Sequence, residues 1–150
     1  MKPYVDVLAA LLTPVIAIVT TYIAIQQYRA NKIRLRHDLY DRRLLLYNSV
    51  AEFISHVVQA GAPDRTKLIL LLRKTRESYF LFGKDVSDYI TDLYKKGVDL
   101  EFYEKQLHQA NLPVGGERTG IANQQAELLK WFSSQFDVIQ AMFAKTLSLQ

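Results

Sequence analysis

The sequence predicts an all-α protein in which an N-terminal transmembrane helix continues into an antiparallel cytosolic helical bundle. Three observations predict this fold: an uncharged segment near the N-terminus, a basic cluster directly after it, and helical spacing of apolar residues in the rest of the chain. The 150 residues are 49% hydrophobic and 23% charged, a composition that excludes a disordered chain. The chain has no cysteine, which excludes disulfide scaffolds, thiolate metal sites and cysteine nucleophiles.

The predicted membrane span is the segment 7–25, which holds nineteen residues, ten of them Leu, Ile or Val, and no charge. A helix of this length measures about 28 Å, close to the hydrocarbon thickness of a bilayer. Tyr4, Tyr22 and Tyr28 lie near its two ends, where aromatic rings favour the membrane interface. Two alternatives stay open, a long buried core helix and a cleaved signal peptide. Asp6 and the lack of a small-residue cleavage site disfavour the signal peptide.

The excess positive charge lies in residues 29–43, which hold six basic and two acidic residues, whereas residues 44–150 hold twelve of each. The positive-inside rule therefore places the C-terminal side in the cytoplasm. Each basic residue near an anionic leaflet contributes about 1 kcal/mol of attraction. The predicted headgroup contacts are Arg29, Lys32, Arg34, Arg36, Arg42 and Arg43. We expect no nucleic-acid partner, because the rest of the chain is neutral and carries no nucleic-acid-binding motif.

The chain divides into an N-terminal segment with the span, 1–28, and a basic juxtamembrane helix with the bundle, 29–150. No Gly or Pro interrupts residues 15–60, so the first helix is expected to run from the span to about residue 59. Further helices are predicted from residue 63 or 64 to Gly83, from Asp85 onward, and from about residue 119 after a loop at 111–118. Gly97 weakens the third helix by about 1 kcal/mol, which favours a kink or a break there.

Two apolar rows follow the basic cluster along the first helix. One is a heptad row of Ile33, His37, Tyr40, Leu44, Tyr47, Ala51, Ile54 and Val58. The other is Leu39, Leu46, Val50, Phe53 and Val57. Together they are wider than a two-stranded coiled coil needs, which favours a bundle.

No motif in the sequence predicts catalysis. The three histidines lack metal-ligand spacing, and the acidic row Asp85, Asp88 and Asp92 alternates with lysines as on a solvated helix face. Gly115-Gly116 does not have the spacing of a nucleotide-binding loop. We therefore expect no enzyme activity, no metal and no cofactor.

Small residues recur at four-residue steps within the span, at Ala9, Thr13, Ala17 and Thr21. Such a row lets two membrane helices approach closely, so it predicts self-association into a homo-oligomer. Pro14 lies within the row and favours a kink.

Several short elements resemble a group of small bacterial single-pass membrane proteins with a cytosolic helical part. They are Asp41-Arg42-Arg43 with Tyr47, Phe80-Leu81-Phe82-Gly83, Trp131-Phe132 and Phe143. The resemblance implies a bacterial inner-membrane location and implies no activity, cofactor or catalytic residue.

These patterns predict a membrane-anchored helical interaction or scaffold protein without catalytic activity. Its partners would be the lipid bilayer and either a protein or a second copy of the chain. The alternative is a membrane-perturbing effector, toxin-like or phage-linked, that acts through an oligomerised span.

Overall fold

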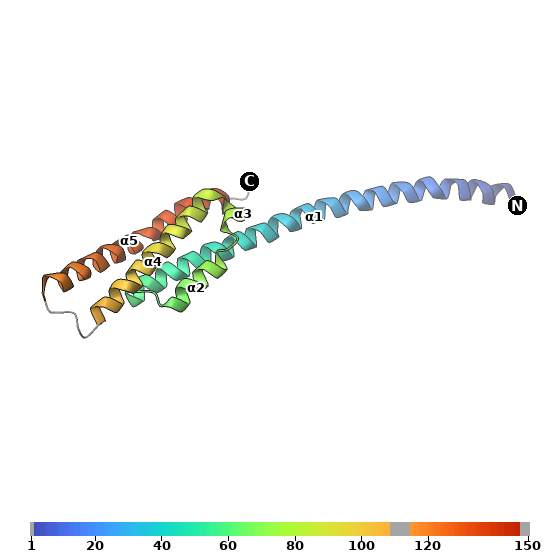
Figure 1. The fold of residues 1–150 in the computed structure, drawn as a ribbon. Coiled ribbons are helices and arrows are strands. Elements are labelled where there is room, and N and C mark those ends of the chain that lie inside the picture. The colour runs from blue at the N-terminus through green and yellow to red at the C-terminus, as the bar shows by residue number, and fades with distance from the viewer. Residues whose placement is uncertain (1, 109–114, 148–150) are drawn as a thin grey trace. The chain divides into compact units, whose positions relative to one another are not determined.

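The protein is all-helical, as predicted. The computed structural model describes residues 2–108 and 115–147, and the side chains of residues 2–11 and 13 also lie outside the description. No strand occurs in this part of the chain. The helices are α1 (Lys2–Ala60), α2 (Arg65–Lys74), α3 (Ser78–Phe82), α4 (Lys84–His108) and α5 (Gly116–Leu147) (Figure 1).

The chain forms two compact units, Met1–Leu39 and Tyr40–Gln150, and the boundary falls within α1. The first unit is the N-terminal part of α1. The second unit is a bundle in which the end of α1 packs with α2, α3, α4 and α5. In the bundle, α4 and α5 contact each other and run in opposite directions (Figure 1). The division predicted at residue 28 is the boundary between the membrane segment and the cytosolic part. The compact units do not test such a boundary, so this division stays a prediction.

All four long helices contribute to one hydrophobic core in the second unit. The buried apolar residues are Leu46, Val50, Phe53, Ile54, Val57, Leu68, Leu71, Val86, Ile90, Leu93, Leu100, Phe132, Ile139 and Phe143. Aromatic rings join the helices edge to face, with centroids 6.2 Å apart for Phe53 and Phe132 and 4.7 Å apart for Phe82 and Phe143.

The core side of α1 is centred on the second predicted row rather than on the heptad row. Leu46, Val50, Phe53 and Val57 are buried, whereas the heptad row contributes only Ile54 as a buried apolar residue. The two rows have the same alternating steps of four and three residues, so their spacing does not decide which of them is buried. The packing of the other helices decides it, because they cover the side of α1 that carries Leu46, Val50, Phe53 and Val57.

The segment predicted as one helix ending at Gly83 is two helices, because a turn at 75–77 separates α2 from α3. Asp64 caps α2 as predicted, and its carboxylate accepts a hydrogen bond from the Lys67 amide at 2.8 Å. The buried hydroxyl of Thr75 donates to the Leu71 carbonyl at 2.7 Å, and the Ser78 amide donates to the Thr75 carbonyl at 2.9 Å. The Thr75 amide also donates to the Leu71 carbonyl at 2.9 Å, so this carbonyl accepts two bonds where α2 ends, and the Ser78 bond closes the turn to α3.

Gly97 does not break α4, which runs through it without interruption. The residue is buried, and a β-carbon there would lie 2.9 Å from Leu68 Cδ2 and 3.1 Å from Phe53 Cζ. Glycine is therefore needed for the close approach of α4 to α2 and α1. The predicted break was wrong because packing outweighs the low helix propensity of glycine.

A polar contact is buried between α4 and α5. The Tyr89 hydroxyl donates to Gln135 Oε1 at 3.1 Å, and Gln135 Nε2 donates to the Trp131 carbonyl at 3.0 Å. Burial, and then the charge of Asp92, raises the pKa of Tyr89. Tyr89 thus stays a neutral donor, and the buried Gln135 has partners for its oxygen and its nitrogen.

We expect Gly97→Ala to lower the free energy of unfolding by about 1 kcal/mol. Overpacking a core costs about 1–3 kcal/mol, whereas alanine returns about 1 kcal/mol of helix propensity. Gly120 in α5 is the matched control, because a β-carbon there meets nothing within 4 Å. Gly120→Ala should raise the free energy of unfolding by about 0.5–1 kcal/mol. Denaturant unfolding followed by circular dichroism measures both, and equal stabilisation by the two variants would contradict the packing role of Gly97.

Candidate functional site

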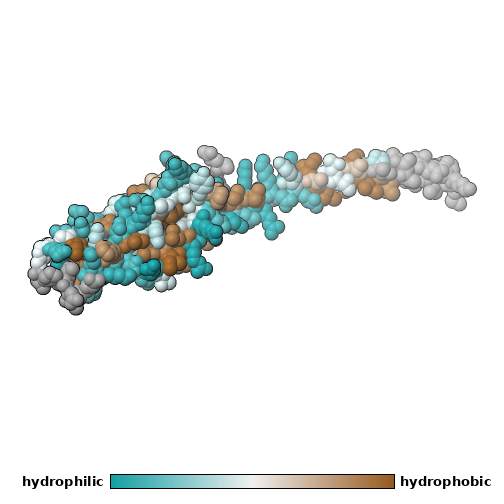
Figure 2. All heavy atoms as spheres, viewed as in Figure 1, coloured by the Kyte–Doolittle hydropathy of each residue, from teal (hydrophilic) through white to brown (hydrophobic). Residues whose placement is uncertain are grey.

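The first candidate surface is the apolar stretch of α1 at residues 12–28. Its large apolar side chains are 46% to 70% exposed: Leu12, Val15, Ile16, Ile18, Val19, Tyr22, Ile23, Ile25 and Tyr28. At 100° per residue they occupy most of the circumference of the helix, and the remaining side carries Ala and Thr. Figure 2 shows this apolar character along the helix. A helix that is apolar on nearly every side is typical of one that is covered all round.

Four polar side chains of this stretch, those of Thr20, Thr21, Tyr22 and Gln26, are hydrogen-bonded within the helix. Thr20 Oγ1 donates to the Ile16 carbonyl at 2.8 Å, and Thr21 Oγ1 donates to the Ala17 carbonyl at 2.7 Å. Gln26 Nε2 donates to the Tyr22 hydroxyl at 3.0 Å. These internal bonds lower the cost of moving the hydroxyls into an apolar environment.

Over the described residues, no helix combines the length and the apolar character that crossing a bilayer requires. Of the predicted span at 7–25, the side chains of residues 7–11 and 13 lie outside the description. The same holds for Ala9 and Thr13 of the predicted self-association row. Ala17 and Thr21 are described, and both are exposed.

The six predicted headgroup residues fall into two groups. Arg29, Lys32, Arg34 and Arg36 are exposed, and within the described chain they make no ion pair. Arg42 is exposed and lies 3.4 Å from the Glu77 carboxylate. Arg43 is half-buried and holds together the end of the bundle.

The Arg43 guanidinium joins three helices of the bundle. Its Nε donates to the Leu81 carbonyl at 3.2 Å and its Nη1 donates to the Thr146 carbonyl at 3.0 Å. The guanidinium carbon also lies 6.0 Å from the centre of the Phe82 ring. The carbonyls at the C-terminal ends of helices lack partners within the helix, and Arg43 supplies one for each of α3 and α5. The sequence placed Arg43 among the headgroup contacts because no local pattern reveals partners so far along the chain.

A groove opens between α1 and the α2–α3 segment, with a volume of about 430 Å³. Leu45, Leu46 and Leu81 form its apolar part, and its charged lining is Arg42, Arg73, Lys74, Arg76 and Glu77. We call this the basic groove. Within the described chain neither Arg73 nor Arg76 makes an ion pair, so the groove carries uncompensated positive charge.

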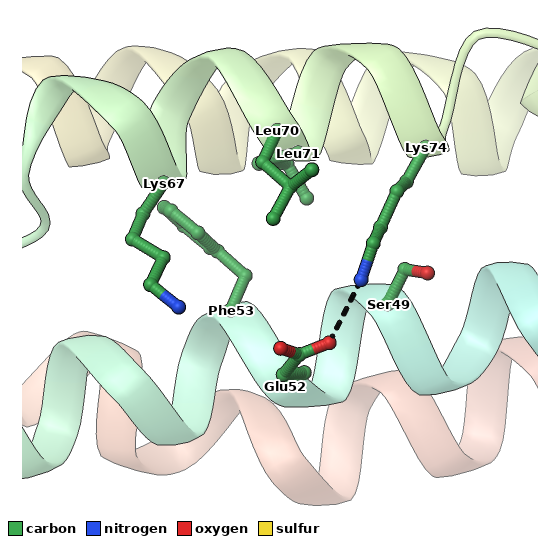
Figure 3. A pocket seen from close by; sticks show the side chains of 7 residues that line it. All are labelled: Ser49, Glu52, Phe53, Lys67, Leu70, Leu71 and Lys74. Atoms are coloured by element: carbon green, nitrogen blue, oxygen red, sulfur yellow. Dashed lines mark hydrogen bonds and ion pairs between the residues drawn. The ribbon is translucent and has the colours of Figure 1, made fainter.

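A smaller cavity of about 20 Å³, room for a single water molecule, adjoins the basic groove and shares Ser49 and Lys74 with it (Figure 3). Across its mouth Lys74 Nζ lies 3.0 Å from Glu52 Oε2. The hydrogen bond and the charge of Lys74 lower the pKa of Glu52. The ion pair favours the charged form of the Glu52 carboxyl. The cavity is too small for an organic ligand.

Two aromatic residues of α3 point away from the core. Tyr79 is 56% exposed and Phe80 is 85% exposed, and their ring centroids lie 5.7 Å apart at 89°. The turn at 75–77 separates α3 from α2, and within α3 it is Leu81 and Phe82 that contact the core.

The described residues contain no group of three or more His, Asp or Glu side chains that could hold a metal ion. In the acidic row of α4, Asp92 pairs with Lys96 at 2.7 Å, which fits the predicted solvated face. The Lys96 ammonium also lies 4.7 Å from the centre of the Trp131 ring.

Comparison of the chain with protein-family models, curated proteins and solved structures finds no match.

We expect Arg43→Met to lower the free energy of unfolding by about 1–3 kcal/mol, because hydrogen bonds to a charged group each contribute about 1.5–3 kcal/mol when buried. Methionine keeps the aliphatic stem, so the change isolates the guanidinium. Arg36→Met, which removes an exposed cation from the same helix, should leave the stability unchanged. Denaturant unfolding in detergent compares the two variants, and equal stabilities would show that Arg43 does not join the helices.

Proposed function

We propose that this protein is a single-pass membrane-anchored helical interaction or scaffold protein with no chemistry of its own. The N-terminal part of α1 would span the bacterial inner membrane, and the bundle would lie in the cytoplasm. The observation that carries this proposal is the apolar stretch of α1, exposed on nearly every side, in which the hydroxyls of Thr20 and Thr21 are bonded within the helix.

Lipid is the cover that best fits this stretch. Each Leu, Ile or Val near the centre of a span favours insertion by about 0.3–0.6 kcal/mol, so the ten between residues 7 and 25 together favour it by about 3–6 kcal/mol. Threonine hydroxyls that donate to the preceding turn need no partner from the lipid. Tyr22 and Tyr28 would then lie near the cytoplasmic interface.

The unpaired cations after the span would set its orientation and depth. Arg29, Lys32, Arg34 and Arg36 have no acidic partner in the described chain, which leaves them available to anionic headgroups. Arg43 is omitted from this set because its guanidinium is bonded within the bundle.

The anchor is tested with a pair of lysine variants of the full-length chain. Ile18→Lys with Val19→Lys places two charges in the span, where each costs about 2.5–3.5 kcal/mol. The control, Ile33→Lys with Leu35→Lys, changes equally exposed residues of α1 outside the span.

Wild type and control should stay in the membrane pellet after alkaline carbonate extraction, whereas the Ile18/Val19 variant should enter the supernatant. A C-terminal tag should resist protease in intact spheroplasts. A wild-type chain released by carbonate, or a tag cleaved from outside, would refute the anchor or its orientation.

One observation favours the alternative of a membrane-perturbing effector. The side of α1 without large residues carries Ala17, Thr20, Thr21 and Ala24, and small residues allow close helix–helix contact in lipid. An effector would collapse the membrane potential when expressed, and Ala17→Leu with Ala24→Leu would restore it. An unchanged potential, measured with a voltage-sensitive dye, favours the scaffold.

A further inference from the structure

The exposed aromatic pair of α3 lies beside unpaired cations. Phe80 is the most exposed of the large apolar residues in the described chain, and Tyr79 stands edge to face with it. Arg76 precedes the pair in the chain and Lys84 follows it. We infer that Tyr79 and Phe80, with Arg42 and Arg76, form a second contact with the bilayer, one that inserts aromatic rings between anionic headgroups. The inference rests on the proposed membrane anchor.

We call Tyr79, Phe80, Arg42 and Arg76 together the tip. The chemistry of this tip fits a lipid interface. Aromatic rings with one polar handle concentrate at the boundary between headgroups and hydrocarbon, and arginines beside them bind phosphate. The Glu77 carboxylate lies next to Arg42, which reduces its repulsion of anionic lipid. The remaining acidic neighbours along the chain, Asp41 and Asp85, are outnumbered by Arg73, Arg76 and Lys84.

The tip is also within reach of the membrane surface. The Arg42–Glu77 contact of 3.4 Å and the Arg43 bond to the Leu81 carbonyl of 3.2 Å hold α3 beside the first turn of α1 in the bundle. Arg42 follows Arg36 by six positions, and six steps of chain span at most about 20 Å. Arg42 therefore stays within about 20 Å of Arg36, the last of the four exposed cations.

A second aromatic pair, with one exposed ring, supplies the control. Phe102 and Tyr103 on α4 have ring centroids 6.1 Å apart, and Phe102 is also exposed. Glu101 and Glu104 flank this pair, and Lys105 pairs with Glu101, so no excess positive charge lies there to attract anionic lipid. The two pairs differ in the sign of their neighbouring charges, which separates lipid recognition from simple exposure.

The test places a single indole at each pair in the full-length chain. In a Trp131→Phe background, Phe80→Trp and Phe102→Trp are reconstituted separately into vesicles of phosphatidylcholine, with or without phosphatidylglycerol. Brominated lipid reports contact with the bilayer, and acrylamide reports exposure to water. Circular dichroism confirms that the variants remain helical.

The indole at position 80 should be quenched by brominated lipid at least threefold more strongly than the indole at position 102. The quenching should fall to the level of position 102 without phosphatidylglycerol, or after Arg42→Gln with Arg76→Gln. Equal quenching at both positions, or quenching that ignores the anionic lipid, would overturn the inference. Shielding from both quenchers would also overturn it, because a protein or a second copy would then cover the tip.

Vesicle flotation separates the two proposals: a chain that does not float refutes the anchor, whereas a floating chain without quenching at position 80 refutes only the second contact.

Discussion

The structure depends on where the apolar side chains of α1 find cover. In the bundle, the row from Leu46 to Val57 lies against α2, α4 and α5 and is fully buried. Between residues 12 and 28 the apolar side chains of the same helix are about half exposed. Removing apolar surface from water is the main favourable term in folding, so the second stretch requires a cover that the described protein does not supply. The fold of the bundle and the proposed location in the membrane thus have the same physical cause, the removal of apolar surface from water.

Close packing and polar contacts together determine how the helices of the bundle fit together. Because Gly97 has no side chain, α4 can approach Leu68 and Phe53 closely, and the Thr75 carbonyl accepts a hydrogen bond from the Ser78 amide in the turn between α2 and α3. Arg43 then bonds carbonyls of α3 and α5 from α1. Among the described residues, no buried side-chain nitrogen or oxygen lacks a hydrogen-bond partner. The bundle combines close packing with complete polar pairing, the usual condition for a single well-defined native state.

The residues of the basic cluster differ in their contacts although they are neighbours in the sequence. The first four cations have no acidic partner in the described chain, and under the proposed function they would face anionic headgroups. Arg42 and Arg43 instead contact α3 and hold it against α1. That contact brings Tyr79 and Phe80 to the end of the bundle at which α1 enters. A helix junction within the bundle thereby links the proposed anchor to the proposed second lipid contact.

The sequence alone determined the local features of this protein. Apolar spacing showed that it is all-helical, Asp64 and Gly83 marked helix ends, and the charge count isolated the cluster at 29–43. These features depend on residues only a few positions apart, and local energetics govern them. The tertiary structure decided the role of Gly97, the bonds of Arg43, the turn at Thr75 and the exposure of Phe80. Each of these depends on atoms tens of residues away along the chain. A periodic pattern of apolar residues does not predict which helix faces pack against each other.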